Sequence, residues 1–197
     1  FNDTCGIHIH CSPYDNEDWE IKDVLKVCKF YINVEEYFYD MLPQSRRIGD
    51  YAKPLENNEY FYDLVKSLPA ATFNNIDNMD KQTIKDLVGS VWYNESDYRY
   101  CTGERRHNTR YVGLNIHSVF YRNTLEFRHF DGNYELLPYF IEFVDRFVDF
   151  CTKNNTSQII DTSYTINSLE DLLNKIGVSP NTKEIFVDRA ETFNAAA

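Results

Sequence analysis

The chain has 197 residues, 43% of them apolar and 16% aromatic, so it predicts a folded domain with a buried core rather than a disordered segment. Its formal net charge of −11 argues against a nucleic-acid partner, because such a surface needs clustered Lys and Arg. No apolar run reaches the roughly 20 residues of a membrane helix, and five cysteines without a CxxC pair favour reduced thiols, so we expect a cytoplasmic protein without a membrane partner.

The first predicted element is a strand within residues 1–12, which ends in the sequence GIHIHCS. Because side chains alternate between the two faces of a strand, His8, His10 and Ser12 share one face and the apolar residues between them share the other. A turn rich in Asp, Asn and Pro follows at residues 13–18. This strand would present two imidazoles and a hydroxyl side by side.

Apolar residues at helical spacing predict three helices in the next part of the chain, over residues 17–42, 59–67 and 80–91. In the third, the inward residues are expected to be Ile84, Leu87, Val88 and Val91. Residues 43–55 show no apolar period and contain Arg46 and Arg47, which indicates an ordered loop. Residues 94–109 are also loop-like and locally basic.

Residues 110–121 and 124–130 read as two strands joined as an antiparallel hairpin across residues 122–123. The second strand contains TLEFRHFDG, in which the period of two places Glu126 and Arg128 on one face. An acid and a guanidinium would therefore lie side by side.

The last third of the chain is predicted to be helical. An apolar stripe predicts a helix over residues 135–151, and a capping-box sequence at Ser168 begins a short helix that Gly177 ends. The polar break near residue 154 divides the expected catalytic domain, residues 1–153, from a C-terminal helical extension, residues 154–197.

Together these elements predict an α+β fold. The histidine strand and the hairpin would form an antiparallel sheet, covered on one face by the helices over 17–42 and 135–151 and open on the other. If the two strands meet, the open face would hold nitrogen and oxygen ligands for a divalent metal and an arginine placed to bind phosphate. Taken singly, the histidines could equally be half-buried polar residues, and Glu126 and Arg128 a surface pair of small energetic value.

These same motifs carry a family resemblance. GIHIHCS is similar to the Gly-x-His-x-His-x-Ser strand of glutamine synthetases, and NTLEFRHFDG resembles their later Glu-x-Arg strand and Asp turn. The chain resembles more closely the bacterial and phage amidoligases, carboxylate-amine ligases of the same superfamily, which also includes gamma-glutamylcysteine synthetase-like enzymes. The resemblance covers roughly residues 1–150 and rests on four ordered segments, at residues 5–10, 46–55, 110–115 and 124–132.

The resemblance implies a role for each matching residue. His8 and Glu126 match ligands of the metal beside the ATP γ-phosphate, and the positions near the nucleotide are matched by His10, Ser12, Arg46 and Arg47. Arg128 matches the arginine that stabilises the phosphoryl group in transit, and Arg110 a phosphate- or substrate-binding arginine. The implied cofactors are ATP and Mg²⁺, with Mn²⁺ as an alternative ion, and the implied partners are a carboxylate and an amine substrate.

One superfamily motif, a Gly-x-Glu-x-Glu strand whose acids complete the metal site, has no counterpart in this chain. We therefore expect those acids to come from a missing N-terminal part of the protein or from a partner chain, and this chain alone would be a doubtful catalyst. The leading hypothesis is an ATP- and Mg²⁺-dependent ligase that forms an amide through an acyl phosphate. The alternatives are a non-catalytic binding or assembly module on the same fold, for example a phage component, and a His-x-His metallohydrolase.

Overall fold

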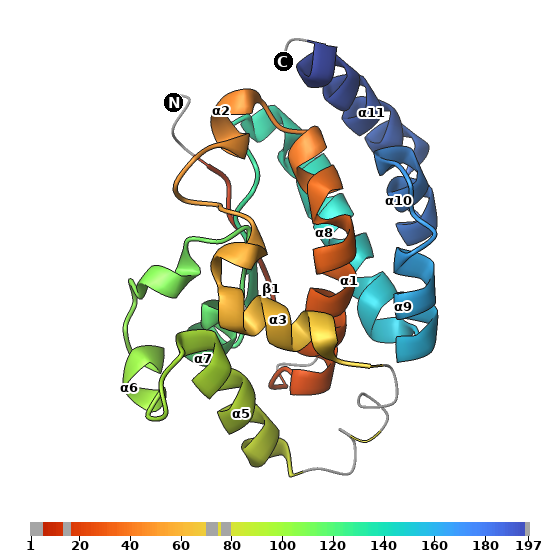
Figure 1. The fold of residues 1–197 in the computed structure, drawn as a ribbon. Coiled ribbons are helices and arrows are strands. Elements are labelled where there is room, and N and C mark those ends of the chain that lie inside the picture. The colour runs from red at the N-terminus through yellow and green to blue at the C-terminus, as the bar shows by residue number, and fades with distance from the viewer. Residues whose placement is uncertain (1–5, 14–16, 70–74, 76–79, 196–197) are drawn as a thin grey trace.

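The computed structural model describes residues 6–13, 17–69, 75 and 80–195, which form an α+β fold (Figure 1). Its strands form an antiparallel sheet in the order β1-β3-β2, made by β1 (Ile9–Cys11), β3 (Leu125–Phe127) and β2 (Leu114–Asn115). The α-helices are α1 (Ile21–Asp40), α2 (Gln44–Arg47), α3 (Glu59–Ser67), α5 (Lys81–Tyr93), α6 (Arg99–Thr102), α7 (His117–Arg122), α8 (Leu137–Lys153), α9 (Thr156–Ser163), α10 (Leu169–Ile176) and α11 (Pro180–Ala195). Short 3₁₀ helices lie at η2 (Leu55–Asn57), η3 (Asn108–Arg110) and η4 (Tyr134–Leu136).

The apolar face of the sheet packs against α1 and α8. Ile9 and Leu114 pair with Phe127 from either side, and all three side chains are buried. The Phe127 ring stacks at 6.1 Å on Phe38 of α1 and meets Phe147 of α8 edge-on at 6.0 Å. Burial of these large rings removes much apolar surface from water and fixes the sheet against the two helices. The expected coverage of one sheet face by these two helices is confirmed.

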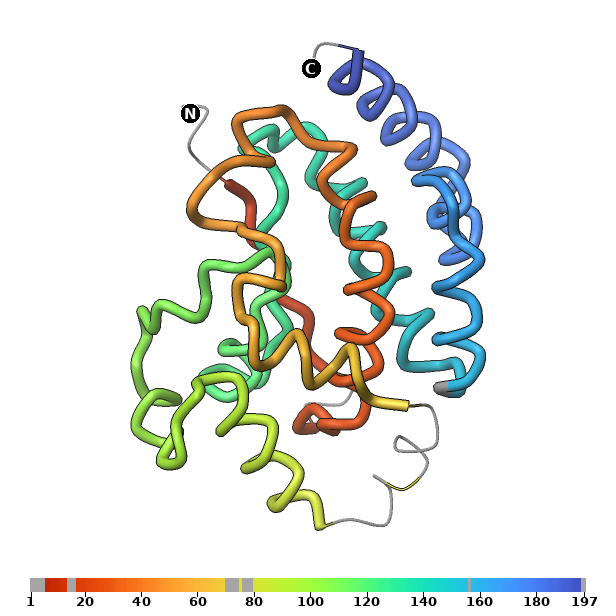
Figure 2. Tube along the Cα trace, in the orientation of Figure 1, coloured from red at the N-terminus to blue at the C-terminus, as the bar shows by residue number. Residues whose placement is uncertain are grey.

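The C-terminal helices form an outer layer on α1 and α8, on the side away from α6 and α7 (Figure 2). The predicted short helix is present as α10: Ser168 Oγ accepts a hydrogen bond from the Asp171 amide at 3.0 Å, and Gly177 ends the helix at a φ of 73°. The sequence predicted a helical extension over residues 154–197 but did not predict α9 or α11 as separate helices. In α11 the buried residues are Thr182, Phe186 and Ala190, an apolar stripe too sparse to predict a helix.

The predicted hairpin is wrong in its first half. Only Leu114 and Asn115 of residues 110–121 pair with β3, and residues 117–122 form helix α7. The Asn115 side chain accepts a hydrogen bond at 2.9 Å from the amide of His117, the first residue of the helix, and Asn123 ends the helix in the left-handed conformation with a φ of 57°. The apolar residues here satisfy a helical spacing as well as a strand alternation, which explains the error.

Smaller differences concern single residues and loops. Leu87 of α5 is 51% exposed although it was expected to face inward, because α5 packs through Ile84 and Val88. The two predicted loops contain the short helices α2 and α6. Residues 1–5 of the predicted first strand and 14–16 of the predicted turn lie outside the described residues.

The structure also bears on the environment expected from composition. In the described ranges, every helix falls short of the length or the apolar character needed to cross a membrane. The thiols of Cys11, Cys28, Cys101 and Cys151 are free, and Cys5 lies outside the described residues.

Candidate functional site

The polar face of the sheet brings the two histidines of the first strand to Glu126 at its centre. In the antiparallel register, His10 of β1 and Asn115 of β2 both lie opposite Glu126 of β3. Because side chains alternate along each chain segment, His8 and Arg128 also reach this face. Residues separated by more than 100 positions in the sequence thus share one site.

Glu126 is the centre of the polar contacts on this face. Its Oε1 lies 2.7 Å from Arg128 Nη1, 3.0 Å from His8 Nδ1 and 3.6 Å from His10 Nε2. Its Oε2 accepts hydrogen bonds from Asn115 Nδ2 at 2.5 Å and Ser118 Oγ at 3.1 Å. Both oxygens are therefore supplied with donors, as a buried carboxylate requires.

These contacts fix the charge of the carboxylate. Burial raises the pKa of Glu126, but the hydrogen bond from His8 and the charge of Arg128 outweigh burial, and the pKa is lowered from its ordinary value. For His10 the burial effect dominates and lowers the pKa, because the attraction of Glu126 is opposed by Arg122 and other cations. The site thus holds an ionised carboxylate beside a neutral His10 at neutral pH.

A cavity of about 180 Å³ opens over this face, and we call it the arginine pocket. Its lining residues lie in or next to β1, η3, β2, α7 and β3, and in the segment before η3: His8, His10, Arg105, Arg110, Asn115, His117, Ser118, Tyr121, Arg122, Glu126 and Arg128. Four arginines and a single acid, Glu126, line this pocket, although the protein as a whole carries a net charge of −11. The arginine pocket is therefore a local centre of positive charge that suits a phosphate or another multiply charged anion.

Arg110 and Arg128, which line this pocket, both contact the ring of Tyr111, which lies outside the lining. Their guanidinium carbons lie 5.1 Å and 5.9 Å from the ring centroid, within the range of cation–π attraction. Among the described residues nothing accepts a hydrogen bond from the buried Nε of Arg110. A buried donor left without a partner is unfavourable, and an anion bound in the pocket would supply an acceptor.

The sequence missed His117, Arg105 and Arg122 as site residues. His117 Nε2 lies 2.9 Å from the carbonyl oxygen of Glu104 and so donates to it, which leaves Nδ1 to accept from the Tyr93 hydroxyl at 2.5 Å. Burial lowers its pKa, so the ring is neutral. The basic character of residues 94–109 was the only sequence signal for Arg105. His117 and Arg122 were not predicted, because residues 110–121 and 124–130 were interpreted as a hairpin.

Three of the residues assigned to the nucleotide by resemblance lie away from the arginine pocket. Ser12 follows the end of β1 and is exposed. The Arg46 guanidinium donates to the carbonyl oxygens of His129 and Arg128, and it packs where a Cβ on Gly6 would stand. Arg47 donates to the carbonyl oxygens of Leu42 and Asp40 at the end of α1. In the described structure both arginines hold main-chain segments together.

A second polar network lies beneath the sheet, on the side of α1. His129, next to Arg128, is fully buried, and its Nε2 lies 2.6 Å from Tyr31 Oη, which lies 2.7 Å from Glu35 Oε1. Burial lowers the pKa of His129 to about 3, so the ring is neutral. The hydroxyl can donate only once, so His129 Nε2–H donates to Tyr31 and Tyr31 donates to Glu35. This chain of hydrogen bonds anchors the end of β3 to α1.

Comparison with known proteins agrees with the arrangement of motifs. Residues 1–136 match the family model described as "Putative amidoligase enzyme". Searches among curated proteins and among solved structures gave no match. The matched range contains every residue that lines the arginine pocket and covers more than half of the chain. The chain therefore belongs to the amidoligase family that this model describes.

Proposed function

We propose that the protein is an ATP- and Mg²⁺-dependent ligase that joins a carboxylate to an amine, built on a glutamine synthetase-like sheet. The observation that carries the proposal is the arginine pocket, which is lined by four arginines and one ionised carboxylate, in a chain of the amidoligase family. A volume of about 180 Å³ is smaller than the roughly 300–1,000 Å³ of pockets that enclose a whole ligand. It suits the phosphoryl end of a nucleotide with the remainder outside.

The metal assigned to this site would be held chiefly by Glu126. Within the described part of the chain, no group of three or more His, Cys, Asp or Glu is arranged to hold a metal ion. Magnesium, however, commonly binds through one or two carboxylates together with substrate phosphates and water. An ion that arrives on the nucleotide would bind Glu126 in place of the hydrogen bond from His8, and it would neutralise phosphate charge; Mn²⁺ would accept the imidazole more readily.

The remaining acidic ligands would come from another polypeptide segment. Glu126 is the single carboxylate among the residues that line the arginine pocket. We propose that an acidic strand, from an earlier part of the protein or from a partner chain, pairs with the outer edge of β1. Support comes from the sheet order, in which β1 pairs with β3 on one side only.

In the proposed reaction, an oxygen of the substrate carboxylate attacks the γ-phosphorus of ATP and releases ADP, which gives an acyl phosphate. The amine nitrogen then attacks the acyl carbon, the C–N bond forms, phosphate leaves and a base takes the amine proton. Arg128 and Arg110 would stabilise the negative charge that builds up during phosphoryl transfer. Glu126 holds Arg128 in position through the 2.7 Å ion pair.

Calorimetric titration with Mg-ATP tests the first step. We expect the wild-type protein to bind Mg-ATP, and the double variant Arg105→Gln/Arg122→Gln, which alters two exposed pocket arginines, to bind at least about tenfold more weakly. Arg106→Gln is the matched control, since Arg106 is exposed, adjacent and outside the pocket lining. Absence of binding to the wild type, or equal loss in the control, would contradict the proposal.

A second assay separates a ligase from a binding module. ADP release is measured with the protein and the acidic segment together, and it should require both a carboxylate and an amine. Tight Mg-ATP binding with no ADP release under any combination would favour the non-catalytic alternative on the same fold.

A further inference from the structure

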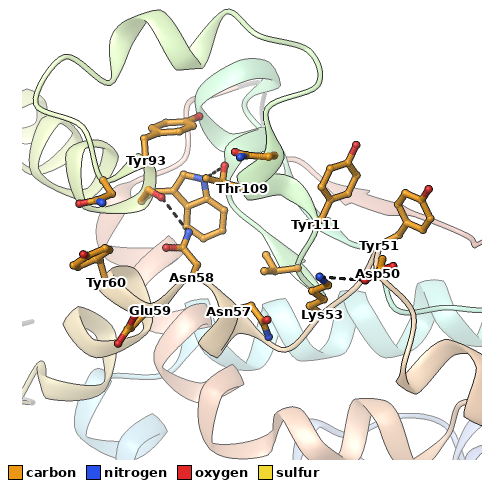
Figure 3. A pocket seen from close by; sticks show the side chains of 14 residues that line it. Asp50, Tyr51, Lys53, Asn57, Asn58, Glu59, Tyr60, Tyr93, Thr109 and Tyr111 are labelled. Carbon is orange, nitrogen blue, oxygen red and sulfur yellow. Dashed lines mark hydrogen bonds and ion pairs between the residues drawn. The ribbon is translucent and has the colours of Figure 1, made fainter.

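A second and larger cavity of about 720 Å³ lies next to the arginine pocket, and we call it the tyrosine pocket (Figure 3). Its floor includes the bridge between Lys53 and Val112, and its walls come from residues 50–60, the end of α5 and η3. The Trp92 indole donates to Thr109 Oγ1 at 3.0 Å, and the Trp92 carbonyl accepts from Asn58 Nδ2 at 3.0 Å. These hydrogen bonds tie the walls to one another, so the pocket is formed before any ligand binds.

The lining of the tyrosine pocket is aromatic and acidic, unlike that of the arginine pocket. Tyr51 and Tyr60 are each 59% exposed, and the rings of Tyr51 and Tyr111 meet at 5.5 Å. The carboxylates of Asp50 and Glu59 line the pocket, whereas its single cation, Lys53, is paired with Asp50 at 3.2 Å. In Figure 3, Glu59 and Tyr60 stand on one side of the pocket, and Asp50, Tyr51 and Tyr111 stand on the other. Aromatic faces next to carboxylates attract organic cations.

No residue lines both pockets, but they are connected through Tyr111, which lines the tyrosine pocket and contacts two arginines of the arginine pocket. Tyr111 lines the tyrosine pocket, and its ring also carries the guanidinium of Arg128 at 5.9 Å. Arg128 Nε donates to the carbonyl oxygen of Tyr51 at 3.2 Å, which also connects the tyrosine pocket to β3. An ammonium group at the Asp50 and Tyr111 end would thus lie beside the arginines of the neighbouring pocket.

From this juxtaposition we propose that the tyrosine pocket binds the amine substrate, and that this substrate is the primary amine of a peptide, such as a lysine side chain. That this amine is a substrate rests on the ligase function proposed above. That the tyrosine pocket binds an ammonium group does not depend on that function. The ammonium group lies against Asp50, Tyr51 and Tyr111, and the body of the peptide extends towards Tyr60.

Size and charge select this class of amine over simpler ones. Ammonia would leave almost all of a cavity of about 720 Å³ empty and would bury no apolar surface against the rings. A free amino acid would bring its own carboxylate next to Asp50 and Glu59, where like charges repel. A lysine within a peptide has neither disadvantage, because its carboxyl and amino groups are in amide bonds and can be bound by the polar side chains of the pocket.

The test is a binding titration without nucleotide, monitored by calorimetry and by the fluorescence of Trp92 in a Trp19→Phe background. The probe is Nα-acetyl-lysine N-methylamide, and the matched control ligand is Nα-acetyl-norleucine N-methylamide, which has the same chain length without the ammonium. We expect the lysine probe to bind and to change the Trp92 emission, and the norleucine analogue and ammonium chloride to bind at least about threefold more weakly, the scale of one exposed cation–π contact.

Two variants locate the binding site. Asp50→Asn removes a side chain that is 85% exposed and leaves Lys53 unneutralised, so it should weaken lysine-probe binding about threefold to tenfold without disturbing the fold. Glu56→Gln is the control, an exposed carboxylate of η2 outside the pocket lining. Equal binding of the norleucine analogue, no binding of the lysine probe at millimolar concentration, or equal effects of both variants would refute the proposal.

The two proposals fail in different ways. If Mg-ATP does not bind but the lysine probe binds and responds to Asp50→Asn, the tyrosine pocket is an ammonium site and the ligase function is wrong. If Mg-ATP binds and the lysine probe does not, the nucleotide assignment holds and the peptide-amine assignment is rejected.

Discussion

Replacement of Glu35 by glutamine should change how the stability of the protein depends on pH. Glu35 lies in α1 beneath the sheet, where its Oε1 accepts hydrogen bonds from Tyr31 Oη at 2.7 Å and from the Leu55 amide at 2.8 Å. Burial raises the pKa of its carboxyl to about 7, and the two hydrogen bonds offset only part of this effect. Glutamine keeps the shape and the accepting oxygen but cannot ionise.

The sign and size of the effect follow from the two pKa values. Between pH 4.5 and about 7, Glu35 keeps a proton in the folded protein that it has released in the unfolded chain. The contribution of Glu35 to the free energy of unfolding is therefore greatest below pH 4.5 and falls as the pH rises to 7. One pKa unit corresponds to about 1.36 kcal/mol, so the rise from 4.5 to about 7 corresponds to about 3 kcal/mol of unfolding free energy lost by the wild type. The Glu35→Gln variant should not lose this part of its unfolding free energy over the same pH range.

Urea unfolding of both proteins from pH 5 to pH 7.5 measures this difference. All other titrating groups are common to the two proteins, so the change in their stability difference isolates Glu35, and we expect it to move by about 2 to 3 kcal/mol in favour of the variant. Glu36→Gln, which changes an exposed carboxylate on the same helix, is the control. A stability difference that stays constant over this range would refute the reasoning.

Three further predictions concern the site and the packing around it. Gly113→Ala should destabilise the protein by about 1 to 3 kcal/mol in urea unfolding, because the added Cβ would overlap the buried ring of His129; a neutral result would mean that this ring can move aside. Arg110→Gln should lower the midpoint of urea unfolding only slightly, since the guanidinium makes one exposed hydrogen bond, to the Arg105 carbonyl oxygen, and one ring contact, with Tyr111, yet lower the rate of ADP release by about a hundredfold in the complete enzyme; an unchanged rate would remove Arg110 from the proposed mechanism. Ser168→Ala should cost about 1 kcal/mol through loss of the hydrogen bond to the Asp171 amide, with Ser168→Asp as a variant that restores a cap; equal stability of both variants would show that the cap contributes little.

The sequence predicted the centre of the site because strand alternation is a local rule. It placed His8 with His10 and Glu126 with Arg128, and the antiparallel register then joined the two pairs. The same rule did not extend to Ser12, which follows the end of β1, is exposed and lies outside the lining of the arginine pocket.

The sequence could not predict the contacts that depend on distant parts of the chain. Arg46 carries the charge of a phosphate ligand, but its bonds to carbonyl oxygens more than 80 residues away place it elsewhere. His117 lines the pocket from helix α7, which stands where apolar alternation had indicated a strand and whose first amide donates to the Asn115 side chain. Local pattern decides secondary structure less reliably where one side-chain hydrogen bond can select between two conformations.

The net charge of −11 and the cluster of arginines in the arginine pocket together determine how the rate of anion binding depends on ionic strength. At very low salt the many surface acids repel an approaching polyanion from every direction. Near physiological salt, ions screen charges beyond about 8 Å, while the arginines that line the arginine pocket remain effective at close range. Moderate salt should therefore speed capture of an anionic ligand, the reverse of the behaviour of a protein that attracts such ligands over a broad basic surface.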